Sequence, residues 1–164
     1  MTDDAAAGGE PVDVLALERQ LCFALATAQR SVLGVYKPLL APLGLTHPQY
    51  LVMLALWEQA PLPAGRLAAV LQQDPATLSP LLKRLEAAGV ITRTRSSTDE
   101  RVLEVGLTAA GAQLRTDALA VPPAVVARLG VPLADLEALH TALVRVNAAA
   151  LDAGTAPPTT GTAG

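Results

Sequence analysis

The chain of 164 residues contains a single cysteine, Cys22. A thiolate is the nucleophilic form of cysteine, and oxidants convert it stepwise to sulfenic, sulfinic and sulfonic acids. One cysteine excludes an intramolecular disulfide and any metal site built from several cysteines. Free cysteines are among the most buried residues in proteins, so an inert core thiol and a reactive thiol are both open from the residue alone.

A second group of residues has the chemistry to hold DNA. Residues 74–89 place hydroxyl groups near the start of a predicted helix, with Lys83 and Arg84 further along it. Residues 90–108 predict two short strands around a polar turn at residues 96–101. A helix for the major groove followed by a basic hairpin is a known way to bind a duplex.

The distribution of charge is compatible with DNA, although the formal net charge is −3. Residues 63–115 contain seven basic and five acidic residues, which leaves five basic and ten acidic residues elsewhere. The centre of the chain is therefore relatively basic and its flanks are acidic, a modest signal in favour of nucleic acid.

Other functions find little support in the sequence. Two histidines are too few for a metal site, and we find no paired carboxylates, Ser-His-Asp order or glycine-rich phosphate loop. We therefore expect no enzyme, metal or cofactor. No apolar run approaches the roughly 18 residues of a membrane span, and the acidic residues 1–11 do not form a signal peptide. A cytoplasmic protein without membrane contact is expected.

The spacing of apolar residues predicts a mainly α fold with a small β wing. A long helix is expected over residues 14–40, with two apolar stripes that indicate contact from two sides. A second helix opens at residues 46–48, a short helix covers residues 64–71, and the next covers residues 74–88. Both Asp74-Pro75 and Ser79-Pro80 are suitable starts for this last helix.

The C-terminal third is predicted to be helical as well. Thr108 caps a helix that runs to about Leu119, where the proline pair of residues 121–123 is expected to break it. A final amphipathic helix is marked by Leu133, Leu136, Leu139, Leu143, Val146 and Ala150.

These elements predict one winged helix-turn-helix domain with added dimerisation helices. The domain should cover residues 13–152, with the DNA-binding part at about 48–108 and the dimerisation helices at about 14–40 and 109–152. Long terminal helices usually bury their apolar faces by pairing two chains. Residues 1–12 and 153–164 are expected to be disordered because they have little to bury.

The whole pattern resembles the MarR family of bacterial transcription regulators. The winged-helix signature is matched by residues 78–86, 89–93, 99–101 and 107–111. The N-terminal half is similar to the organic hydroperoxide resistance repressors of that family, through residues 20–25, 36–40 and 45–54.

The resemblance implies a homodimer that binds a palindromic operator and releases it when Cys22 is oxidised by an organic hydroperoxide. It also places Tyr36 and His47 at two positions where this branch has tyrosines that hydrogen-bond the sensor sulfur of the other subunit. This sequence departs from the pattern of that branch at three places, and these departures bear on the reactivity of the thiol. Histidine replaces a tyrosine at position 47, Ala26 replaces a further tyrosine, and Pro75-Ala76 replaces a Ser-Gly pair.

Geometry supports contact between subunits. Tyr36 follows Cys22 by 14 residues, which is about 21 Å along a straight helix at about 1.5 Å per residue. Tyr36 therefore cannot reach its own Cys22, and if the two residues meet, they meet across a dimer. Hydrogen bonds from a phenol and an imidazole would favour the thiolate, most strongly if His47 were protonated. The alternatives are a core role for Tyr36 and a helix-capping surface role for His47.

The resemblance also implies the DNA contacts. On the recognition helix they are Pro75, Thr77, Ser79, Lys83 and Arg84. The alternative for Lys83 and Arg84 is a solvated helix face.

On the hairpin, the resemblance places Arg101 at the wing tip, where it enters the minor groove, while Asp99 orients the wing. Arg93 and Arg95 lie on the strands and are either phosphate contacts or surface charges.

The leading hypothesis is a thiol-based repressor of an organic peroxide detoxification gene, of the one-cysteine type. Without a second cysteine, the sulfenic acid must be capped by a low-molecular-weight thiol, close to a sulfenamide, or over-oxidise. One alternative is a regulator that responds to a small aromatic ligand in the dimer cleft, with Cys22 inert. Another is a winged helix that binds only protein, against which the basic hairpin argues.

Overall fold

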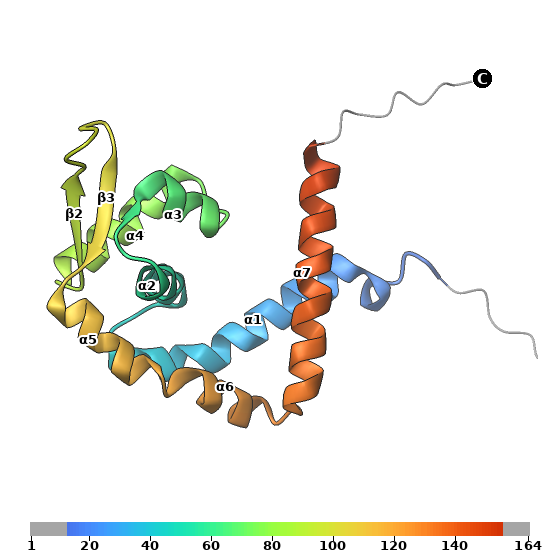
Figure 1. Cartoon of the computed structure of the whole chain (residues 1–164). Helices are drawn as coiled ribbons and strands as arrows, with labels where there is room; N and C mark the ends of the chain where they lie inside the picture. The colour runs from blue at the N-terminus through green and yellow to red at the C-terminus, as the bar shows by residue number, and fades with distance from the viewer. Residues whose placement is uncertain (1–12, 156–164) are drawn as a thin grey trace, which may run out of the picture. The chain divides into compact units, whose positions relative to one another are not determined.

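A computed structural model describes residues 13–155 of the chain, and these divide into two compact units after Leu119 (Figure 1). The first unit contains η1 (Leu17–Arg19), α1 (Leu21–Leu40), η2 (Ala41–Leu43), α2 (His47–Glu58), β1 (Leu62–Pro63), α3 (Ala64–Val70), α4 (Pro75–Ala87), β2 (Ile91–Arg95), β3 (Leu103–Leu107) and α5 (Ala109–Ala118). The second contains α6 (Val121–Leu129) and α7 (Leu133–Thr155). The mainly helical winged-helix fold expected from the sequence is confirmed.

The first long helix starts later than the sequence indicates. Gln20 has an extended backbone, with φ −80° and ψ 123°, so the three residues of η1 form a separate turn before α1. Its side-chain amide stabilises this break by donating to the carbonyls of Val14 and Ala16, at 2.8 and 3.2 Å. The helix expected from residue 14 therefore begins at Leu21, and Cys22 lies in its first turn.

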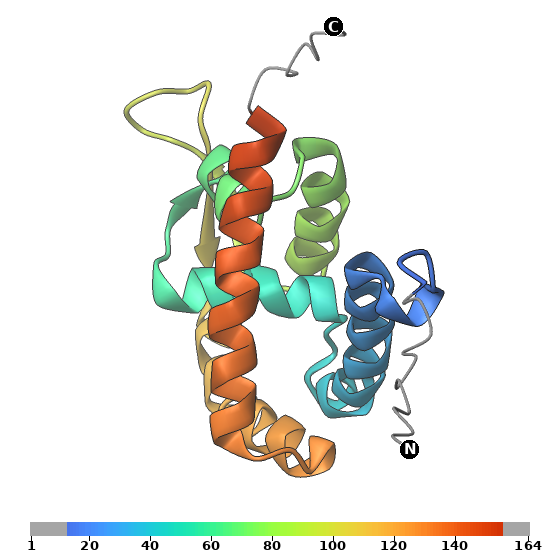
Figure 2. The ribbon, with the colours of Figure 1, turned by 90° about the vertical axis from the view of Figure 1, so that its right-hand side faces the viewer.

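Helices α1 and α2 are set at 67° to each other, and Figure 2 shows α2 from the side. Thr46 caps α2 through a reciprocal pair of hydrogen bonds with Gln49, and Pro48 fits the first turn because no donor is needed there. At the other end of α2, the indole N–H of Trp57 donates to the carbonyl oxygen of Gly111 at 2.8 Å. This bond ties α2 to the start of α5.

Asp74, rather than Ser79, is the N-cap of α4. Its Oδ1 accepts a hydrogen bond from the backbone N–H of Thr77 at 2.8 Å, and its Oδ2 accepts one from the Thr77 hydroxyl at 3.1 Å. The backbone bond is the largest cause of a lowered pKa for the Asp74 carboxyl. Pro75 is the first helical residue, and Pro80 lies inside the helix, where it cannot donate to the carbonyl one turn earlier.

The sheet has the order β1-β3-β2 and is antiparallel throughout. Strands β2 and β3 form the expected hairpin, with Ile91 opposite Leu107 and Arg95 opposite Leu103. Strand β1 is an addition to the two strands that the sequence predicts. An edge strand tolerates Pro63, which cannot donate to a ladder hydrogen bond.

The core of the first unit joins the winged helix to the end of α1. The largest fully buried side chains are Leu40, Val52, Met53, Leu56, Leu67, Leu78, Leu85, Ile91 and Val105. Leu78, Leu82 and Leu85 lie on one face of α4, a spacing that matches the helical period. This burial fixes which face of α4 is presented to solvent.

The helix capped by Thr108 ends at Ala118, so the expected break before residues 121–123 is confirmed. The sequence did not predict that Pro122 and Pro123 would occupy the first turn of a further helix, α6, where proline is tolerated. One expectation for the C-terminal region is wrong, because residues 153–155 belong to α7 rather than to a disordered tail. The disorder expected for residues 1–12 and 156–164 lies outside the described residues.

Helix α7 exposes a long apolar surface in the single chain. Its exposed large side chains are Leu133, Leu139, Leu143, Val144, Val146 and Leu151. Within residues 13–155, no single helix is long and apolar enough to cross a membrane; two bent helix pairs reach that length and composition together.

Candidate DNA-binding surface and cysteine sensor

The solvent-exposed face of α4 carries the predicted DNA contacts. Pro75, Thr77, Ser79, Lys83 and Arg84 are all exposed. The opposite face is held in the core, so the helix can approach a groove without unfolding. The Thr77 hydroxyl is engaged with Asp74 at the cap, which gives this residue a structural role as well.

The wing tip presents Arg101 to solvent. Its side chain is 92% exposed. Both its backbone N–H, at 3.0 Å, and its Nε, at 3.2 Å, donate to Oδ1 of Asp99. Asp99 therefore holds the turn around Arg101. The Arg95 guanidinium donates to the carbonyl oxygen of Arg101 at 3.4 Å and supports the same turn from β2.

Arg93 is placed differently from the other predicted DNA-binding arginines. Its side chain is only 20% exposed and forms an ion pair with Glu86 of α4. The Nε atom donates to Oε2 of Glu86 at 2.9 Å, and a terminal guanidinium nitrogen donates to the same oxygen. The sequence did not single out Glu86, because this pairing depends on how the strand lies against the helix.

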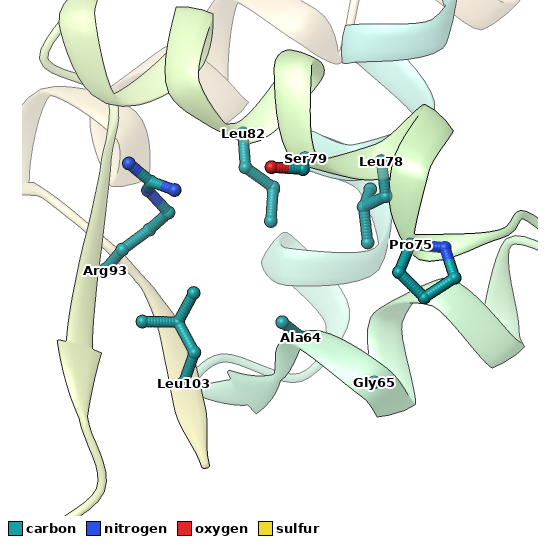
Figure 3. Close-up of a pocket in the computed structure, with 8 residues that line it drawn as sticks. All are labelled: Ala64, Gly65, Pro75, Leu78, Ser79, Leu82, Arg93 and Leu103. Atoms are coloured by element: carbon teal, nitrogen blue, oxygen red, sulfur yellow. The ribbon is translucent and has the colours of Figure 1, made fainter. Parts of the chain in front are cut away.

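A hollow of about 220 Å³ separates part of α4 from α3 and the wing (Figure 3). It is lined by Ala64, Gly65, Pro75, Leu78, Ser79, Leu82, Arg93 and Leu103. Figure 3 shows Arg93 extending from its strand toward α4 at one side of this hollow. The ion pair with Glu86 therefore bridges two elements that do not pack tightly along their whole length.

The predicted sensor residues are not all brought together in one chain. Cys22 is exposed in the first turn of α1. Tyr36, near the other end of α1, contacts His47 at the start of α2, with ring centroids 5.1 Å apart and an interplanar angle of 72°. The single chain thus carries the thiol and the Tyr36–His47 pair at opposite ends of one helix.

His47 is half-buried, and this burial lowers the pKa of its imidazole below the ordinary value. In the single chain the lowered pKa favours the neutral imidazole, whose N–H is still a hydrogen-bond donor. A hollow of about 400 Å³ lies beside it, lined by Leu33, Lys37, Ala41, Leu45, Thr46 and His47.

An aromatic row continues from this pair along α2. Tyr50 lies 6.2 Å from Tyr36 and 6.3 Å from Trp57, measured between ring centroids. Tyr50 is buried. Burial, followed by the charge of Tyr36, raises the pKa of its phenol. The row connects the Tyr36–His47 pair to Trp57 and its bond to Gly111.

Comparison with known proteins assigns this winged helix to a family. A model of the MarR family matches residues 45–103. The chain is also 42% identical over 131 residues to the organic hydroperoxide resistance transcriptional regulator of Bacillus subtilis strain 168, covering 80% of this chain and 89% of that protein. The chain belongs to the MarR family. It is a DNA-binding transcriptional regulator and not an enzyme.

Solved MarR-family structures agree with this assignment. Reduced AbfR of Staphylococcus epidermidis bound to DNA has a TM-score of 0.68 at 32% identity, covering 82% of this chain and 94% of that one. CouR of Rhodococcus jostii RHA1 bound to a 23-mer DNA duplex has a TM-score of 0.74 at 27% identity, covering 84% and 99%. AbfR has also been solved overoxidised on DNA, and CouR with p-coumaroyl-CoA.

Proposed function

We propose that the chain is a homodimeric repressor that senses organic hydroperoxides through Cys22 and releases its operator on oxidation. The observation that carries the proposal is the separation of an exposed thiol from a Tyr36–His47 pair on one helix. The similarity to an organic hydroperoxide resistance regulator supports the same function. We place its action in the cytoplasm, on a palindromic operator.

Each chain supplies half of the proposed sensor site. Helix α1 has 20 residues and is about 30 Å long at about 1.5 Å per residue. Two α1 helices that cross in antiparallel fashion would set Cys22 of one chain beside Tyr36 and His47 of the other. Leu21, Phe23 and Leu25 are exposed around the cysteine, and a partner chain would cover this apolar surface.

The proposed reaction begins with attack of the Cys22 thiolate on a peroxide oxygen. An S–O bond forms as the O–O bond breaks, and the departing alkoxide takes a proton and leaves as an alcohol. Sulfur is oxidised to sulfenic acid and the peroxide is reduced. The Tyr36 hydroxyl and the neutral His47 N–H would donate hydrogen bonds to the thiolate. A low-molecular-weight thiol then displaces water to form a mixed disulfide.

Release of DNA would follow from crowding at this site. An oxidised or capped sulfur is larger and more polar than a thiol, and a packed interface has little room for it. Movement of Tyr36 and His47 would act on both α1 and α2. Through α2, the Trp57–Gly111 bond reaches the base of the wing. A change in the distance between two recognition helices would remove the match to one DNA turn of roughly 34–36 Å.

The proposed DNA contacts use α4 and the wing. The face of α4 that carries Thr77, Ser79, Lys83 and Arg84 would enter the major groove, and Arg101 would enter the minor groove. The full exposure of Arg101 and its ordered turn support this placement. The hairpin charges also argue against a winged helix used only for protein binding.

The deciding experiment measures operator affinity of the wild type and Cys22→Ser before and after cumene hydroperoxide. We expect both reduced proteins to bind and only the wild type to release DNA, because a hydroxyl cannot be oxidised as sulfur is. Mass spectrometry should accompany the binding assay and separate mixed disulfide from sulfonic acid, since overoxidised AbfR has been solved on DNA. Equal behaviour of the two proteins would show that Cys22 is not the sensor.

The alternative is a ligand-responsive regulator in which Cys22 is inert. The hollow beside His47 favours this alternative, because its apolar lining and the Lys37 cation suit a small aromatic acid. CouR shows that a relative of this fold can bind an aromatic acyl compound. Release of DNA from both the wild type and Cys22→Ser by an aromatic carboxylate, without oxidant, would select this function instead.

A further inference from the structure

We propose that the Glu86–Arg93 ion pair is a clasp that holds the wing at the angle at which Arg101 reaches DNA. Glu86 and Arg93 are then positioning residues and not DNA contacts. The inference rests on the proposed placement of Arg101 against the duplex. It does not depend on the chemistry of Cys22, so the two proposals can fail separately.

The guanidinium of Arg93 is bound to Glu86 of α4. Two guanidinium nitrogens donate to one carboxylate oxygen of Glu86, one of them from Nε at 2.9 Å. The Arg93 side chain is 20% exposed and that of Glu86 is 39% exposed. An arginine poised to contact DNA presents its guanidinium to solvent, as Arg101 does with 92% exposure. The guanidinium of Arg93 is instead held by Glu86.

The position of the pair explains what it would do. At the base of the wing, the Thr108 hydroxyl donates to the carbonyl oxygen of Gly89 at 2.7 Å, and its backbone N–H donates to Val90. The tip, at residues 96–101, projects away from this base (Figure 1). Arg93 is the middle residue of β2, between the fixed base and the tip.

Part of α4 does not pack against the wing. The hollow of about 220 Å³ lies between them, with Leu82 of α4 and Leu103 of β3 on its lining (Figure 3). Interiors are normally filled closely, and a gap loses the contacts that would fix two elements against each other. Arg93 lies at one side of this hollow and pairs there with Glu86 of α4, and a two-donor contact restricts orientation as well as distance.

The clasp and simple electrostatics predict opposite changes in DNA affinity when the Glu86 carboxylate is removed. Glu86 places a carboxylate on the helix that approaches phosphates, so simple electrostatics predicts tighter DNA binding when it is removed. If Glu86 instead holds Arg93 and the wing, its removal weakens binding. Glu104 on β3 is a matched control. It is an acid in the same sheet as Arg93, and none of the ion pairs among the described residues includes it.

The test uses reduced, full-length protein and a duplex that the wild type selects from a random-sequence pool. Its affinity is measured over a range of salt concentrations for Glu86→Gln, Arg93→Gln, the double variant and Glu104→Gln. We expect each single variant of the pair to bind about ten-fold more weakly, and the double variant to be no weaker than either. The dependence of log affinity on log salt should keep its slope, and Glu104→Gln should not weaken binding.

A second measurement separates positioning from general stability. Arg101→Ala is made in the wild type and in Glu86→Gln. If the clasp positions the wing, the roughly five- to 150-fold cost of losing Arg101 shrinks strongly in the Glu86→Gln background. A merely structural ion pair would lower the melting temperature and leave the cost of Arg101→Ala unchanged, which would overturn the proposal.

Two further outcomes would also overturn it. Tighter DNA binding by Glu86→Gln would show that charge outweighs position. A drop of about one in the salt slope for Arg93→Gln would show that Arg93 contacts a phosphate. Should Arg93→Gln fail to fold, Arg93→Lys replaces it, because lysine keeps the charge without the planar two-donor geometry. Wild-type affinity in Arg93→Lys, together with wild-type affinity in Glu86→Gln, would then contradict the clasp.

Discussion

The rings of Tyr36 and His47 meet edge to face within one chain, with centroids 5.1 Å apart, although Tyr36 lies on α1 and His47 begins α2. Aromatic pairs in this arrangement are favourable beyond the area that they bury. The contact presents a phenol and an imidazole together at the end of α1 that is remote from Cys22. Burial lowers the pKa of the imidazole, which favours its neutral form in the single chain.

Replacing His47 tests this donor directly. His47→Phe keeps a flat ring against Tyr36 but loses the N–H, so we expect slower oxidation of Cys22 without loss of the reaction. The measurement is the rate of thiol disappearance with cumene hydroperoxide at fixed pH. Tyr36→Phe is the matched variant, because it removes the phenol alone. An unchanged rate in both variants would remove the pair from the sensor site.

The same histidine should give stability a pH dependence. Because the folded-state pKa of His47 lies below the unfolded value of about 6.5, the unfolded state binds more protons between the two values. The contribution of His47 is therefore fully present above the unfolded pKa and declines as pH falls toward the folded one. Melting temperatures of the wild type should fall more steeply than those of His47→Phe as pH is lowered from 7 toward 5. Parallel curves would contradict this.

Arg101 should carry a large share of DNA affinity. We expect Arg101→Ala to weaken operator binding by about 1–3 kcal/mol, the size of one good groove contact. Thr77→Ala should cost less affinity and change sequence preference more, because Thr77 lies on the exposed face of α4. Quantitative gel shifts on the selected duplex and on single-base variants of it provide the measurement. A folded Arg101→Ala protein with wild-type affinity would remove the wing from the DNA-binding surface.

Gly111 is required for the close approach of α5 to the base of the wing. A Cβ atom at this position would lie 1.8 Å from the carbonyl oxygen of Val90, so backbone must move. Overpacking of this kind costs about 1–3 kcal/mol, and we expect Gly111→Ala to lower the free energy of unfolding by about the upper value. Gly65→Ala is the control, because nothing lies within 4 Å of its added Cβ. Equal effects in chemical denaturation would refute the explanation.

The apolar surface of α7 should be covered in a dimer. Leu139, Leu143 and Val146 are exposed in the single chain. Burial of such side chains is worth roughly 1.5–3 kcal/mol each. We expect light scattering to show a dimer at micromolar concentration, and Leu143→Asp to shift it toward monomer or to prevent folding. A wild type that is monomeric and stable at that concentration would exclude the homodimer.

The sequence by itself determined the features that depend on near neighbours in the chain. Thr108 was expected to cap α5, and its hydroxyl accepts a hydrogen bond from the Gly111 N–H at 3.0 Å. The hairpin and the apolar face of α4 follow in the same way from turn residues and helical period. These signals lie within a few residues of one another, so they persist in every arrangement of the whole chain.

Only the tertiary structure decided the contacts between elements. The sequence predicted a helix break at residues 121–123 but not the helix α6 that begins there, which packs Val121 and Val125 into buried positions. Likewise, Arg93 could be assigned to Glu86 only when the lie of β2 against α4 was known. Contacts between side chains of different elements depend on the angle and depth at which the two elements pack. Those quantities come from the side chains of the whole core and are not encoded in the local spacing of either partner.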